Sequence, residues 1–85
     1  MVNHQRLHQI RSVDIKVLEI IAEVSDITIE EIEQNKSLRE LGMDSLDVYD
    51  TIMKIEEQTG VVISDEELAE MKTIKDLIDF VGKKR

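Results

Sequence analysis

The spacing of apolar residues along the chain is helical almost throughout and predicts an all-α fold. The first helix is predicted over about residues 12–25, with Ser12 as a candidate N-cap. Its apolar stripe is formed by Val13, Val17, Ile20, Ile21 and Val24. Residues 25–44 form a long connection without sustained periodicity, in which the capping-box spacing of Thr28 and Glu31 predicts a short helical turn. The residues expected to hold this connection on the core are Ile29, Ile32, Leu38 and Leu41.

A second helix is predicted from Ser45 to Thr59. It should end at Gly60, because glycine readily adopts the left-handed conformation that closes many helices. The run Val61-Val62-Ile63 is apolar and β-branched, yet it has no evident partner strand. We therefore expect a buried linker here.

Two more helices are expected before the chain ends. Ser64-Asp65-Glu66-Glu67 opens a short helix that reaches Met71, and Thr73 begins the last helix. The inward stripe of the last helix, before Gly82, consists of Ile74, Leu77, Ile78 and Val81. The predicted architecture is a small four-helix bundle of three longer helices and one short helix, with a long loop between the first two.

The second helix carries two apolar faces instead of one. Its core face is formed by Val48, Thr51, Ile52, Ile55 and Thr59. The opposite face carries Leu46, Tyr49 and Met53, surrounded by Asp50, Glu56 and Glu57, with Asp47 nearer the flank. An apolar centre with an acidic rim is typical of a docking surface for a basic partner. The alternative is that the following linker and short helix cover this face, and periodicity favours neither.

Size and composition exclude several classes of function. The chain of 85 residues should form a single domain over 1–85, with a core at about 12–82 and short basic ends. It has no cysteine, and both histidines, His4 and His8, lie in the first ten residues, so no metal or redox site is expected. No apolar run is long enough for a signal peptide or a membrane span. We expect a cytoplasmic protein without stable membrane insertion.

The net charge of −8 is unevenly distributed. Residues 12–82 hold six bases and all nineteen acids, which gives them a net charge of −13. Nucleic acid is therefore a poor partner and a basic protein a better one. The simpler alternative is that the acids only keep a small domain soluble.

A candidate attachment site lies at the start of the second helix. Gly42 lets the chain turn, and Asp44 can accept hydrogen bonds from the first free helix amides, which leaves the Ser45 hydroxyl pointing outward. A phosphodiester on this oxygen would lie near the positive end of the helix dipole. Taken alone, Asp44-Ser45 is a helix cap and nothing more.

The motif Gly42-Met43-Asp44-Ser45-Leu46-Asp47 stands in a wider pattern that resembles an acyl carrier protein from about residue 12 to 82. Glu56-Glu57, Ile63 and Thr73-Ile74 also fall in the register of that family. The resemblance implies a 4'-phosphopantetheine arm on Ser45 that holds acyl groups as thioesters, with no catalytic residue in this chain. It also implies a carrier of fatty acid biosynthesis or a related acyl pathway.

Partner residues follow from the same resemblance. The partners implied are a phosphopantetheinyl transferase and the acyl-transferring and acyl-modifying enzymes, each with a basic docking patch, and the carrier is expected to be a monomer. The residues expected to contact them are Asp44, Leu46, Asp47, Asp50, Met53, Glu56 and Glu57, together with Tyr49 on the same face.

Two departures from the fatty-acid carriers keep alternatives open. Tyr49 replaces a small β-branched residue, and Thr51 stands where a core leucine is common. A dedicated carrier of a specialised polyketide or aminoacyl pathway is one alternative. A different class of protein, an unmodified acidic helical interaction module that binds through its exposed apolar patch, is another. An enzyme is not expected, because no histidine, cysteine or lysine is placed to act as a base for Ser45.

Overall fold

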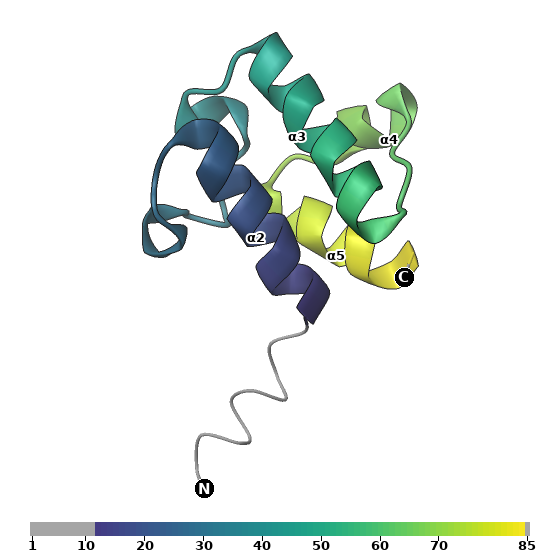
Figure 1. Cartoon of the computed structure of the whole chain (residues 1–85). Coiled ribbons are helices and arrows are strands. Elements are labelled where there is room, and N and C mark those ends of the chain that lie inside the picture. The colour runs from purple at the N-terminus through teal and green to yellow at the C-terminus, as the bar shows by residue number, and fades with distance from the viewer. Residues whose placement is uncertain (1–11, 85) are drawn as a thin grey trace, which may run out of the picture.

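The computed structural model describes residues 12–84, whose regular elements are all helices, with no strand among them (Figure 1). The basic N-terminal end and Arg85 lie outside the described residues. The helices are α2 (Ser12–Ser25), α3 (Ser45–Thr59), α4 (Asp65–Glu70) and α5 (Ile74–Lys84), and the long connection contains the 3₁₀ turns η1 (Ile29–Glu31) and η2 (Arg39–Leu41). Helix α2 packs against both α3 and α5. The predicted architecture of three longer helices and one short helix is confirmed.

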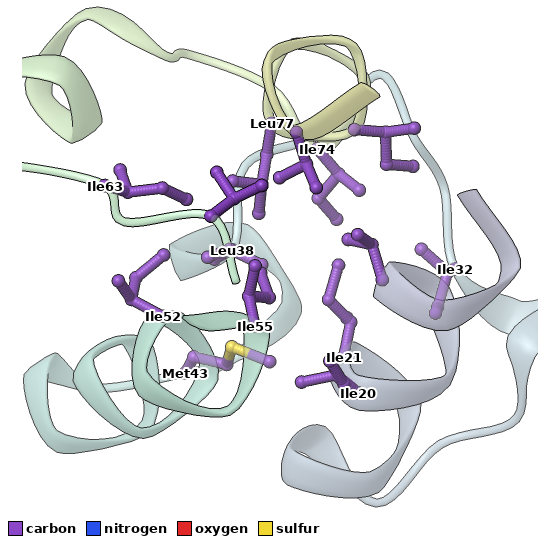
Figure 2. Packing of buried hydrophobic residues seen from close by; sticks show 14 residues of the cluster. Ile20, Ile21, Ile32, Leu38, Met43, Ile52, Ile55, Ile63, Ile74 and Leu77 are labelled. Carbon is purple, nitrogen blue, oxygen red and sulfur yellow. The ribbon is translucent and has the colours of Figure 1, made fainter. Parts of the chain in front are cut away.

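The core lies where α2, α3 and α5 meet (Figure 2). Ile20 and Ile21 of α2 face Ile55 of α3, and Ile74 and Leu77 of α5 lie above them in this view. All five side chains are almost fully buried. The predicted inward stripes of the three longer helices are confirmed, except that the flanking residues Val13, Val24, Val48 and Thr59 are only partly buried.

Capping residues set most helix boundaries as predicted. At η1 the Thr28 amide donates to Glu31 Oε1 at 2.9 Å, and at α4 the Glu67 amide donates to Ser64 Oγ at 3.1 Å. Gly60 ends α3 with φ of 80°, the left-handed conformation expected of it. Local side-chain chemistry therefore determines where these elements begin and end.

The bounds 12–25 predicted for the first helix are confirmed, but Ser12 belongs to α2 and does not precede it as an N-cap. The predicted end of the last helix is wrong. Helix α5 continues through Gly82 to Lys84, because Lys83 and Lys84 favour the negative end of the helix dipole and the ammonium of Lys84 lies 5.4 Å from the Phe80 ring centroid.

Two predicted core residues in the non-helical segments are exposed. Ile29 is 37% exposed, because the chain leaves η1 at Ile32 in an extended conformation and turns Ile32 into the core instead. In the linker after α3, Val61 and Ile63 are buried while Val62 between them is 63% exposed. The linker is extended without a partner strand, so its side chains alternate between core and solvent.

The long connection is fastened to the start of α5. The Ile74 amide donates to the Lys36 carbonyl at 2.8 Å, and the Lys75 amide donates to the Gln34 carbonyl at 2.9 Å. These bonds satisfy amides that a helix start leaves free. They place the residues that follow Lys36, including η2, next to the start of α5.

Candidate functional site

A glycine turn fixes the chain just before α3. Gly42 has φ of 98°, and its amide donates to the Arg39 carbonyl at 2.9 Å. The next residue, Met43, is only 3% exposed and anchors the turn in the core, although the sequence prediction did not include it among the core residues. This anchored turn sets the position of α3's first residues.

Asp44 caps α3 as predicted. The Asp47 amide donates to Asp44 Oδ1 at 2.8 Å, and the Val48 amide donates to the Asp44 carbonyl at 3.0 Å. The Asp44 amide donates in return to Asp47 Oδ2 at 3.4 Å. Because Asp44 is the cap, the hydroxyl of Ser45 is not needed for capping, and Ser45 is exposed as the first residue of the helix.

Among residues 12–84, the Ser45 hydroxyl has one side-chain hydrogen-bond partner, which the sequence prediction missed. Arg39 Nη2 donates to Ser45 Oγ at 3.1 Å, from η2 across the glycine turn. In the sequence Arg39 is simply one of six bases in an acidic body, six residues from Ser45, and no periodic pattern relates the two. The contact depends on the left-handed conformation of Gly42, which a residue count does not reveal.

A pocket of about 180 Å³ opens beside this site. Its apolar lining comes from Leu38, Val48, Leu68, Met71 and Leu77, and its polar lining from Ser37, Arg39, Lys72 and Thr73. Arg39 thus contacts Ser45 and also borders the pocket. Both charged residues of the lining are cations, in contrast to the acidic chain as a whole.

The outer face of α3 is open to solvent. Leu46 is 77% exposed, Tyr49 58% and Met53 57%, so the alternative that the linker and α4 cover this face is wrong. The acidic residues predicted around them, Asp50, Glu56 and Glu57, are also exposed, and Asp47 is half-buried at the flank. The cap residue Asp44 is exposed as well. All eight predicted partner residues therefore lie along one helix, from its cap to its last turn.

The opposite face of α3 holds the unusual Thr51, which is fully buried. Its hydroxyl donates to the Asp47 carbonyl at 2.9 Å and lies 3.8 Å from the sulfur of Met43. The hydroxyl is thus satisfied within α3 and its preceding turn. Thr51 is also absent from the lining of the pocket beside Ser45.

Residues 12–84 contain no group of three or more histidine, cysteine or acidic side chains arranged to hold a metal ion. None of their helices has the length and apolar character needed to cross a membrane.

Comparison with known proteins gives consistent matches. Residues 16–81 match the family described as the phosphopantetheine attachment site. The acyl carrier protein of Nitratidesulfovibrio vulgaris is 39% identical over 75 residues, which cover 87% of this chain and 99% of that protein. Those of Solidesulfovibrio magneticus and Buchnera aphidicola are 40% and 38% identical, over 87% and 86% of this chain and 96% and 94% of theirs.

Proposed function

Since this chain belongs to the acyl carrier protein family and carries acyl groups on 4'-phosphopantetheine, we propose that Ser45 is the residue to which this arm is attached. The observation that carries the proposal is the exposed Ser45 at the first position of α3, directly after the cap formed by Asp44. When bound, the arm supplies the thiol that this cysteine-free chain lacks, and the acyl group is held on it as a thioester.

Three other serines of the described chain are already used in local structure. Ser37 Oγ accepts from the Glu40 amide at 3.1 Å, and Ser64 Oγ accepts from the Glu67 amide. Ser25 Oγ donates to the Ile21 carbonyl at 2.6 Å. Modifying Ser25 would remove the proton that it donates, and a group on Ser37 or Ser64 would crowd an oxygen that accepts from a backbone amide. Ser45 Oγ instead contacts the side chain of Arg39.

Attachment is tested with the apo protein, coenzyme A and a broad-specificity phosphopantetheinyl transferase, followed by intact-mass measurement. We expect the wild-type chain to gain the mass of one phosphopantetheine group and Ser45→Ala to gain none. Ser37→Ala is the matched control, because Ser37 lies at the same end of the molecule and borders the pocket. Modification of the Ser45→Ala protein would refute the assignment.

We also propose that the exposed face of α3, together with Asp44, is the surface that the transferase and the acyl-handling enzymes contact. Its apolar centre offers contact area, and its acids attract a basic patch. Met53→Glu should raise the KM of the transferase about tenfold, the effect of removing one central contact. Val62→Glu is the matched control, because Val62 is equally apolar and exposed but lies outside α3. Equal effects of the two substitutions would refute a surface on α3.

The pocket beside Ser45 supports a role in housing part of the acyl cargo. It is mainly lined by aliphatic side chains and shares Arg39 with the attachment site. Thr51 gives no support to a specialised polar cargo, because its hydroxyl bonds within α3 and it does not line the pocket. We therefore favour a carrier of fatty acid biosynthesis or a related acyl pathway over a dedicated polyketide or aminoacyl carrier.

The remaining properties follow from this role. We propose that the chain acts as a single, monomeric, non-catalytic domain that serves separate enzymes in the cytoplasm. The interaction-module alternative makes the opposite prediction for Ser45→Ala, which would then leave function intact.

A further inference from the structure

Arg39 and Ser45 are hydrogen-bonded at the start of α3, one charged and the other neutral. The guanidinium donates to a neutral hydroxyl at 3.1 Å, an interaction weaker than the bond it would make to an anion. Within residues 12–84, three lysines are engaged in ion pairs, namely Lys36 with Glu33, Lys54 with Glu23 and Lys75 with Asp79. Arg39 forms no such pair with a carboxylate of the described chain.

Attachment of the arm would change the partner of this guanidinium. The phosphorus would be bonded directly to Ser45 Oγ, the atom that Arg39 already contacts, so the free phosphodiester oxygens would lie two bonds from that atom. A planar guanidinium can bind two phosphate oxygens at once, in a geometry that a lysine cannot reproduce. Little movement of the Arg39 side chain is needed for it to bind the phosphodiester in place of the Ser45 hydroxyl.

Binding of the phosphodiester by Arg39 would also offset the repulsion between the phosphodiester and the nearby carboxylates. Asp44 and Asp47 hold α3's first turn through their mutual capping bonds, so both carboxylates belong to the same helix start as Ser45. A phosphodiester would add a further negative charge beside them. Arg39 is the cation in direct contact with the attachment oxygen that can compensate this charge.

We propose that Arg39 is the residue that binds the phosphodiester of the arm and directs its first segment along the pocket that Arg39 also lines. This inference rests on the proposed attachment at Ser45. It assigns Arg39 the role of a positioning residue for the arm, and no part in bond formation.

The test compares wild-type, Arg39→Ala and Arg39→Lys proteins after each has been loaded with the arm. The ³¹P resonance of the phosphodiester should differ between wild type and Arg39→Ala, and the Nε–H and Nη–H signals of Arg39 should shift when the arm is attached. Arg39→Lys should restore only part of the wild-type ³¹P signature, because its ammonium lacks the planar fork. Lys36→Ala is the matched control, since it removes a cation from the same connection without touching Ser45.

A second measurement gives a magnitude. Attachment of the arm should raise the folding equilibrium constant about two- to fivefold more in the wild-type protein than in Arg39→Ala, as expected for an exposed ion pair. High salt should abolish this difference. Identical ³¹P resonances, or equal stability changes, in the two proteins would overturn the inference.

Failure of the inference is distinguishable from failure of the attachment site. Intact mass is measured first for every variant. If Arg39→Ala acquires the arm with an unchanged ³¹P signature, Ser45 remains the attachment site and the role of Arg39 is refuted. If wild-type protein acquires no arm, or Ser45→Ala acquires one, both proposals are refuted together.

Discussion

Replacing Gly42 by alanine should separate the stability of the fold from the presentation of Ser45. Gly42 lies between η2 and the cap residue Asp44, with φ of 98°, a region that L-amino acids rarely adopt. A Cβ at Gly42 would meet no atom within 4 Å, so Gly42→Ala introduces backbone strain without a steric clash. The expected penalty is about 1–2 kcal/mol, the cost of a left-handed conformation for a residue with a Cβ.

Gly60 provides a control within the same molecule. It has φ of 80°, ends α3 far along the helix from Ser45, and likewise leaves 4 Å of open space around the position a Cβ would take. Both Gly42→Ala and Gly60→Ala should therefore lower the melting temperature, by about 4–8 °C for each kcal/mol lost in a domain of this size. Thermal unfolding followed by circular dichroism measures both.

The two variants should differ in their modification by the transferase. If strain opens the turn at Gly42, the ratio of open to closed turn rises by about 5–30-fold for 1–2 kcal/mol. Because only the closed turn presents Ser45 as the structure shows it, the apparent KM should rise by at most that factor. Gly60→Ala should keep the wild-type KM. A Gly42→Ala protein with wild-type stability, or equal KM values for the two variants, would refute this reasoning.

Three further predictions concern stability. Ile55→Ala should lower the free energy of unfolding by about 2–5 kcal/mol, because Ile55 is fully buried between α2 and α5, and a denaturation midpoint near that of wild type would contradict this. Hydrogen bonds from backbone amides lower the pKa values of Glu31, Glu67 and Asp76 below their ordinary values. These three carboxylates therefore stabilise the folded protein at neutral pH, and this stabilisation is lost as the pH falls through the lowered pKa values. An acid titration should accordingly show a shallower loss of stability for a variant with Glu31→Gln, Glu67→Gln and Asp76→Asn combined. Added salt should raise the melting temperature, since residues 12–82 carry a net charge of −13, and a midpoint that salt leaves unchanged would show that self-repulsion is weak.

Predictions from the sequence succeed where a local rule is sufficient. The end of α3 at Gly60 and the start of α4 after Ser64 each depend on one residue and its near neighbours. The prediction of Asp44 as a cap has the same basis, and its bond to the Asp47 amide confirms it. Such signals lie within a few residues of the feature that they determine.

Features that depend on the path of the chain could not be predicted in this way. Ile29 and Ile32 are equally apolar and three residues apart, but only the conformation of the chain after η1 decides that Ile32 is buried. The contact between Arg39 and Ser45 requires the turn at Gly42. Periodicity describes a helix and says little about residues on either side of a turn.

The outer face of α3 can stay exposed because the side chains on the opposite face of the helix are buried in the core. Thr51 and Ile55 are fully buried, and Ile52 nearly so, so α3 is held in the fold without any contribution from its outer side. Exposed Leu46 and Met53 are then not needed for stability, and a substitution there should change the unfolding free energy by no more than about 0.5 kcal/mol. Met53→Glu can therefore weaken partner binding in a protein of wild-type stability. A measured loss of stability in that variant would show that the outer face also supports the fold, and would remove the argument for a surface reserved for partners.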